Sequence, residues 1–147
     1  MKFGLAIISN LNQDKTNLIT KLSNELEIAF KYRKYGNDVK AFTIGIVCVE
    51  PQFEQFFKPK KAKYTKGKKE INPDGFPFLL EDDLEYDVKI DFETFKNATE
   101  QECRRILAKE ILNSLSVFES MKKKIKDFDL KIFKDDLECY FKEKKMI

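Results

Sequence analysis

The amino-acid sequence predicts an α+β protein in which helices pack on an antiparallel sheet of about four to five strands, in the order β-α-β-(β-β)-β-α-α. Three segments support this prediction: an alternating strand over residues 84–93, an apolar strand over residues 39–49, and a strongly patterned helix that begins near residue 99. The alternating strand needs a core on one face and water on the other, which an antiparallel sheet with helices on one side provides. At 147 residues the chain is expected to form a single domain, residues 1–147.

The first half of the chain is expected to fold as strand, helix and strand. Residues 3–8 form a short apolar run that is typical of a buried strand. Asn12 or Asp14 can cap the helix that follows, and Gly36 lies where the C-terminal stop of that helix is expected. Residues 39–49 are rich in β-branched and apolar residues, with one apolar face and an opposite face that is only weakly polar, which predicts a central strand. The helix would bury residues that recur at helical spacing, namely Leu18, Leu22, Leu26, Ala29 and Phe30.

Two helices are expected in the second half of the chain. Thr99 and Glu102 form the T-x-x-E pattern of a capping box directly before an apolar stripe. That helix is predicted to bury Cys103, Leu107, Ile111, Leu115 and Phe118. A last helix is predicted, with Asp127 or Asp129 near its start. It would point four side chains into the core, those of Phe133, Leu137, Tyr140 and Phe141.

The composition argues against the common enzyme and cofactor classes. The chain has no histidine, so neither a Ser-His nor a Cys-His nucleophile can be assembled, and the glycine-rich phosphate-binding motifs are missing. Its three cysteines, Cys48, Cys103 and Cys139, are widely spaced and form no CxxC pair, so no zinc site is predicted. We therefore expect no catalytic residues, no metal and no cofactor.

Charge and hydropathy narrow the expected location and partners. The formal net charge is +3, from 28 basic and 25 acidic residues, whereas a nucleic-acid-binding protein usually has a larger basic excess. No apolar run approaches the ~20 residues that span a bilayer, so we expect no membrane contact and a cytoplasmic location. In that reducing compartment, Cys48 and Cys103 are expected to be buried as small hydrophobic residues.

An acidic stripe follows the water-facing side of the predicted strand over residues 84–93. Alternate residues on one strand face lie ~7 Å apart, and a line of like charges repels itself unless cations lie beside it. One interpretation is a face that binds a basic partner, because charge complementarity gives fast and selective association. The other is that neighbouring strands supply the cations from the lysines of residues 58–69. The predicted partner-binding residues are Glu85, Asp87, Asp91 and Glu93.

The lysine-rich residues 58–69 support an alternative function, that of a nucleic-acid-associated accessory protein. Tyr64 lies among these lysines and could stack on a base. One tyrosine is a small platform, however, and no RNA- or DNA-binding motif accompanies it. A solvated loop or an edge strand protected by lysines is the commoner cause of such a stretch.

Two groups of phenylalanines lie beside prolines. We expect the loops that hold them to tuck the rings over the core; the alternative is an aromatic anchor in an interface. The two groups are Phe53, Phe56 and Phe57, which follow Pro51, and Phe76 and Phe78, which flank Pro77.

Several segments of the second half are shared with a known family. They are Lys69-Glu70-Ile71 at the end of the lysine-rich stretch, Val88-Lys89-Ile90-Asp91-Phe92-Glu93, Ile111-Leu112-Asn113-Ser114-Leu115, Lys124–Asp129, and Phe133 with Asp135-Asp136-Leu137. With these segments, roughly residues 64–141 resemble the small α+β immunity proteins that accompany bacterial polymorphic toxins.

This resemblance implies a function but no individual site residue. Such proteins bind and neutralise a cognate toxin domain by direct contact, with no chemistry and no cofactor. Toxin domains that attack nucleic acids are often basic, and a basic nuclease domain would suit an acidic face. The contact residues are therefore predicted from the acidic stripe alone.

Overall fold

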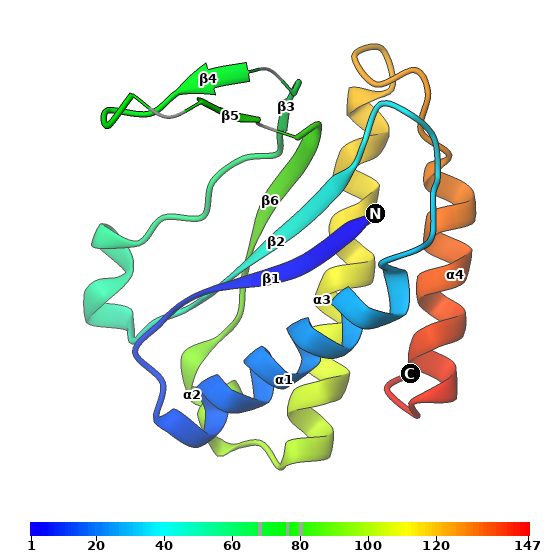
Figure 1. Ribbon diagram of the computed structural model, residues 1–147. Coiled ribbons are helices and arrows are strands. Elements are labelled where there is room, and N and C mark those ends of the chain that lie inside the picture. Colours follow the sequence, from blue (N-terminus) through cyan, green and yellow to red (C-terminus); the bar gives the residue numbers. More distant parts are fainter. Residues whose placement is uncertain (68, 76, 80) are drawn as a thin grey trace.

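The computed structural model describes residues 1–67, 69–75, 77–79 and 81–147 (Figure 1). Its elements in chain order are β1 (Lys2–Ser9), α1 (Gln13–Phe30), β2 (Ala41–Cys48), the 3-10 helix η1 (Pro51–Phe56), β3 (Lys63–Thr65), β4 (Lys69–Ile71), β5 (Pro77–Leu79), β6 (Asp83–Lys89), α2 (Phe92–Asn97), α3 (Glu100–Phe118), the 3-10 helix η2 (Glu119–Met121) and α4 (Leu130–Glu143).

Four strands form a mixed sheet in the order β1-β2-β6-β3. β1 is parallel to β2 and β2 is parallel to β6, whereas β3 is antiparallel to β6. The prediction of an antiparallel sheet was therefore wrong. Parallel neighbours need a long crossover, and α1 provides one between β1 and β2. The prediction that residues 39–49 form a central strand is confirmed, because β2 lies between β1 and β6.

The middle of the chain holds more short elements than the predicted pair of strands. β4 and β5 form a separate antiparallel hairpin that projects away from the four-stranded sheet (Figure 1). β3 is an additional edge strand of the main sheet, and η1 precedes it. The lysine-rich segment thus contributes to both sheets.

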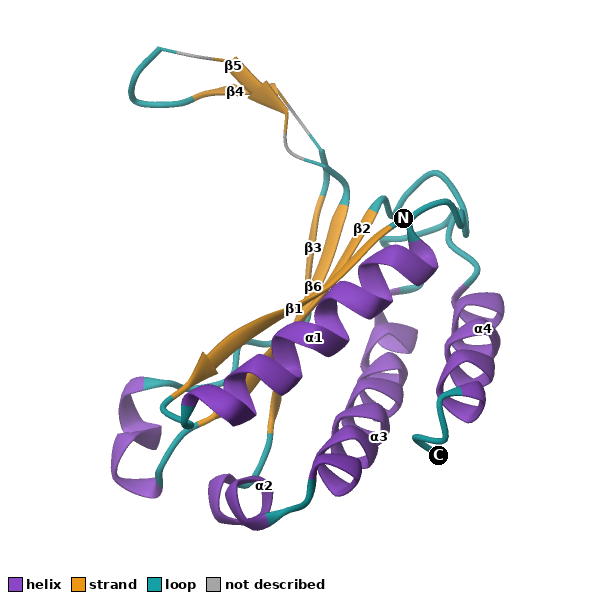
Figure 2. Cartoon of the chain, turned by 60° about the horizontal axis from the view of Figure 1, so that its bottom comes forward, coloured by secondary structure: helices purple, strands orange, loops and turns teal. Residues whose placement is uncertain are grey.

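The three long helices, α1, α3 and α4, lie together on one side of the main sheet (Figure 2). The Asn12 side chain caps α1 by accepting a hydrogen bond from the backbone of Lys15 at 2.9 Å. The capping box of Thr99 and Glu102 is present at the start of α3, and Asp129 caps α4. These caps satisfy backbone N–H groups that a helix start leaves without partners.

The predicted helical stripes largely match the buried residues. All five residues predicted for α3 are buried. On α1, Leu22, Leu26 and Phe30 are buried as predicted. Leu18 is only half-buried, and its neighbour Ile19 is buried instead. On α4, Phe133, Leu137 and Phe141 are buried and Tyr140 is half-buried.

Phe133 lies at the centre of an aromatic cluster between the helices and the sheet. Its ring centroid is 5.0 Å from that of Phe42 and 5.1 Å from that of Tyr35. Three further rings surround it: Phe3, Phe30 and Phe128. The core is therefore built largely on packed phenylalanines, which bury large apolar areas.

Gly36 does not end α1, which ends at Phe30 instead. Gly36 has a φ of +135° and lies so close to the backbone of Asp127 that an added Cβ would overlap the carbonyl oxygen. Asp127 also accepts hydrogen bonds from the backbone and side-chain nitrogens of Asn37, at 3.1 and 2.8 Å. The Asp38 carboxylate accepts in return from the backbone of Asp127 at 2.8 Å. Glycine is needed here because two loops join backbone to backbone.

The strand predicted for residues 84–93 was wrong at its C-terminal end. β6 ends at Lys89, and Asp91 is the N-cap of α2, where its carboxylate accepts from the Thr94 backbone at 2.9 Å. Phe92 is buried within that helix. The alternation of polar and apolar residues continues past the end of β6 because Asp91, the polar N-cap of α2, is followed by the buried Phe92.

The free edge of β1 is closed by a side chain of α1. The Ser23 hydroxyl accepts a hydrogen bond from the Leu5 backbone N–H at 2.8 Å and donates to the Leu5 carbonyl at 3.4 Å. One hydroxyl thus satisfies both backbone groups of an edge residue.

Two further predictions concern cysteines and membrane spans. Cys48 and Cys103 are buried and unpaired, as predicted, and Cys139 is exposed. No helix in the described part of the chain combines the length and apolar character needed to cross a bilayer.

Candidate functional site

The face of the main sheet turned away from the helices displays small and acidic side chains. In β2, Phe42 and Ile44 face the helices, so Thr43 and Gly45 between them face the other way. We call this surface the open face and its three carboxylates the acidic row. The open face consists of Ala6 on β1, Thr43 and Gly45 on β2, and the acidic row of Asp83, Glu85 and Asp87 on β6.

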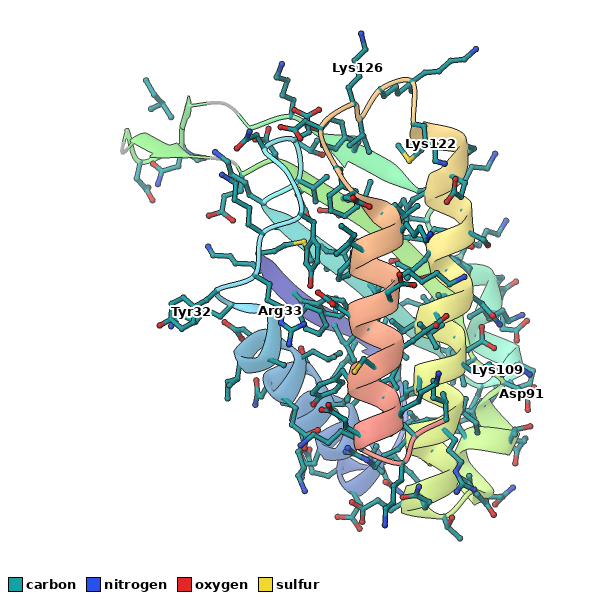
Figure 3. All side chains as sticks on the ribbon, turned by 90° about the vertical axis from the view of Figure 1, so that its right-hand side faces the viewer. Tyr32, Arg33, Asp91, Lys109, Lys122 and Lys126 are labelled. Carbon is teal, nitrogen blue, oxygen red and sulfur yellow. The ribbon has the colours of Figure 1, made fainter. Side chains whose placement is uncertain are left out.

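Only two of the four predicted partner-binding residues lie in the acidic row. Glu85 and Asp87 lie side by side on β6, as expected. Asp91 caps α2 and Glu93 lies in the first turn of that helix, beyond the end of the strand, so the predicted line of four was wrong for both (Figure 3). Asp83 was missed, although it has the same parity as Glu85 and extends the alternation by one step toward the N-terminus.

Asp83 and Glu85 are crowded together without a cation between them. Burial, followed by the hydrogen bond and the charge of Glu85, raises the pKa of Asp83 to about 7. The Thr43 hydroxyl, 3.4 Å from the Asp83 carboxylate, opposes this rise in pKa by donating a weak hydrogen bond. Near neutral pH, therefore, Asp83 holds a proton for a large part of the time.

The Asp87 side chain lies against Gly45 of the neighbouring strand β2. Its carboxylate accepts a hydrogen bond from the backbone of Lys60 at 2.8 Å. A Cβ added to Gly45 would overlap the same carboxylate. The missing side chain of Gly45 therefore makes room for the charge of Asp87 on the open face.

Cations lie beside the acidic row, on the neighbouring strand β3 and at the end of β6. The strand register places Lys63 of β3 directly opposite Glu85. Yet in the part of the chain that the structure describes, no lysine or arginine side chain forms an ion pair with Asp83, Glu85 or Asp87. Lys89 pairs instead with Glu54 at 3.1 Å. The neighbouring strand thus places a lysine beside the acidic row, as one interpretation expected, but no ion pair forms there among the described residues.

The aromatic side chains of η1 and the residue after it are exposed. Phe53, Phe56 and Phe57 have exposed fractions of 40%, 69% and 45%, so the expectation that they tuck over the core was wrong. Position 76 and the side chain at position 78 lie outside the described part of the structure, so the prediction for Phe76 and Phe78 is not tested.

Tyr64, the residue of the lysine-rich segment that could stack on a base, packs against the protein. Tyr64 is half-buried, and its hydroxyl donates to the Asp38 carbonyl, so its ring is fixed against the protein. β3 is the lysine-bearing edge strand that protects the sheet. Among the residues described, no cluster of three or more cysteines and carboxylates is placed to hold a metal ion.

Comparison with known proteins connects this architecture to a family. Searches of curated proteins and of solved structures found no match to the chain. The sequence model of a protein family described as Immunity protein 44 matches residues 1–143. This match includes the first half of the chain, which lies outside the resemblance noted for residues 64–141. Because the match covers nearly the whole sequence, the chain belongs to the Immunity protein 44 family.

Proposed function

We propose that this protein binds a cognate toxin domain in the bacterial cytoplasm and neutralises it by direct contact through the open face, without catalysis. Membership of an immunity protein family supports the role. The single observation behind the proposed surface is the acidic row. Three carboxylates lie together on a sheet face that no described long helix covers, and none of them has an ion-pair partner among the described residues (Figure 2).

A basic partner would relieve the strain of the acidic row. A lysine or arginine placed between Asp83 and Glu85 favours the charged form of both carboxyls and removes their mutual repulsion. Ala6 is exposed on β1, and its small side chain leaves room for a long basic side chain beside the Asp87 carboxylate. Close charge pairs across an interface contribute roughly 1.5 kcal/mol or more each, and they also speed association.

This surface also suggests how neutralisation would work. A toxin domain that acts on nucleic acid holds the phosphates of its substrate with lysine and arginine. A protein that presents carboxylates to those cations competes with the substrate for the same surface. Inhibition then needs only binding at a one-to-one ratio and no chemical step.

A growth-rescue experiment tests the role. The C-terminal domain encoded by the gene immediately upstream is expressed from an inducible promoter, with and without this protein. We expect toxicity that only this protein relieves. Absence of toxicity, or toxicity that the protein does not relieve, would contradict the proposal. Binding of a generic oligonucleotide with a steep salt dependence would favour the alternative function instead.

A matched pair of charge reversals tests the surface. Glu85→Lys with Asp87→Lys should lower the affinity for the purified upstream domain at least about 100-fold, with a strong dependence on salt. The control is Glu27→Lys with Asp135→Lys, which makes the same change in net charge at exposed positions on α1 and α4. We expect the control to bind and to rescue growth like the wild type. Equal affinities for the two variants would show that the acidic row is only a solvated surface.

A further inference from the structure

A second surface feature adjoins the acidic row and lies outside the hydrophobic core. Phe53, Phe56 and Phe57 expose large parts of their rings within one short segment, and we call them the aromatic rim. The hydrophobic effect favours burial of such rings, by about 25 cal/mol for each Å² of apolar surface. Three exposed phenylalanines close together are typical of a site at which another molecule covers them.

The rim is held in place and is not a loose loop. Two hydrogen bonds join Glu50, which precedes η1, to Asn10: the Glu50 backbone donates at 3.0 Å, and its carboxylate accepts at 3.1 Å. The ion pair between Glu54 and Lys89 fastens η1 to the end of β6. Because these contacts order the segment before any partner arrives, binding at the rim loses little conformational entropy.

The rim is continuous with the open face. Lys89, which anchors η1, follows Asp87 by two residues on the same face of β6. The chain that leaves η1 reaches the Asp87 carboxylate through the backbone of Lys60. A cavity of about 290 Å³ lies between η1 and the sheet, lined by Val47, Val49, Glu54, Gln55, Phe57, Lys58, Pro59 and Lys89.

We propose that the aromatic rim is the apolar anchor of the same interface, and that the toxin domain inserts an apolar side chain into the cavity beside Phe57. This inference rests on the proposed function. It specifies the partner surface as an apolar side chain next to a cluster of lysines or arginines. Charges on the open face speed and select the encounter, while the rim slows dissociation by burying apolar area.

The acidic row beside the rim favours a basic partner over a second copy of this chain. Of the two lysines that line the cavity, Lys89 is paired with Glu54 and Lys58 is exposed. In a symmetric pair of copies that met through the rim and the adjoining face, the acidic row of one would come close to that of the other. Like charges held close together oppose such an association. Glu50, at the base of the rim, has hydrogen bonds and no ion pair among the described residues, which adds one more charge that a basic partner could meet.

Alanine substitutions at matched exposed positions test the proposal. Phe56→Ala should weaken binding to the purified upstream domain at least about 20-fold, through faster dissociation, with little dependence on salt. Phe53→Ala should act in the same direction with a smaller change. The controls are Tyr32→Ala in the turn after α1 and Ile28→Ala on α1, whose side chains are 90% and 76% exposed, and both should bind within about 2-fold of the wild type. Tyr32 projects from the end of α1, on the side of the molecule opposite Asp91 (Figure 3).

The outcomes separate this inference from the proposed function. If Phe56→Ala binds like the wild type while Glu85→Lys with Asp87→Lys does not bind, the rim is not an anchor and the proposed function stands. If the wild type itself does not bind the domain, both fail. If Phe56→Ala turns a wild-type dimer into a monomer with unchanged affinity for the domain, the rim joins two copies and the proposal is overturned. Thermal unfolding of each variant checks that the fold is kept.

Discussion

The two faces of the main sheet differ in every property that matters for stability and for recognition. β2 shows the difference within one strand: Phe42 and Ile44 are fully buried under the helices, whereas Thr43 and Gly45 alternate with them on the open face. The covered face is aromatic and aliphatic, and its contacts form one hydrophobic cluster. The open face carries small residues and three carboxylates, with Lys63 and Lys89 beside them. The covered face holds the core, and the proposed partner-binding surface lies on the opposite side of the same strands, so substitutions can test each side alone.

The largest effect is expected on the covered face. Phe133→Ala should lower the free energy of unfolding by about 3–5 kcal/mol, because it removes the ring at the centre of the aromatic cluster and leaves a cavity. Ile132→Ala, at the neighbouring position of α4 where the side chain is 51% exposed, should change it by less than about 0.5 kcal/mol. Urea denaturation followed by circular dichroism measures both. Similar losses for the two variants would break the comparison between faces.

An intermediate effect is expected from Asp83 on the open face, and it depends on pH. The pKa of Asp83 is about 7 in the folded protein and near 3.8 when unfolded, so the folded state binds more protons between these values. The free energy of unfolding should therefore fall as pH rises from about 4 to about 7, and level off above that. Because Asp83 is only partly buried, we expect a fall of about 1–2 kcal/mol rather than the full value of the shift.

Substitution isolates this contribution. Asp83→Asn should remove that part of the pH dependence and should raise stability at pH 8. Glu85→Gln removes the neighbouring charge, so the pKa of Asp83 should decrease and the pH window should end at a lower value. Denaturation curves collected at several pH values test this. The same pH dependence in the wild type and in Asp83→Asn would show that folding does not raise the pKa of Asp83.

The smallest effect sharpens the comparison within the open face. Gly45→Ala adds a methyl group where the Asp87 carboxylate lies, so the carboxylate should shift and lose its bond to Lys60. We expect the affinity for the toxin domain to fall about 3- to 10-fold, with less than about 1 kcal/mol lost in stability. Gly4→Ala is the control, because a Cβ there meets only the Ser23 hydroxyl at an ordinary 3.8 Å. Calorimetric titration of both variants measures the difference, and equal affinities would remove Gly45 from the site.

Local signals predicted the helices well, and non-local arrangements were harder to predict. The caps at Asn12, Thr99 and Asp129 and the stripe of α3 follow from residues within two turns of each other. Strand direction depends on which segments meet across the sheet, which no local pattern encodes. One available signal was the apolar character of both faces of residues 39–49, which is typical of parallel strands.

Two of the four predicted site residues, Glu85 and Asp87, lie on the strand, and the other two lie at the start of α2. Asp91 fits both a strand face and a helix cap, and the Thr94 backbone and hydroxyl that bond to it decide for the cap. Asp83 could have been found by starting the alternation one residue earlier. The exposure of Phe56 depends on how η1 is held against β6, and the sequence pattern alone does not contain that information.

The Ser23 hydroxyl has a consequence for how this protein behaves when many copies accumulate. An edge strand with unpaired backbone groups invites a strand from another molecule, and such pairing leads to aggregation. Ser23 occupies both backbone groups of Leu5 on the outer side of β1. An incoming strand would have to displace this hydroxyl before it could extend the sheet. A single side chain thus hinders edge-to-edge pairing at this point of β1.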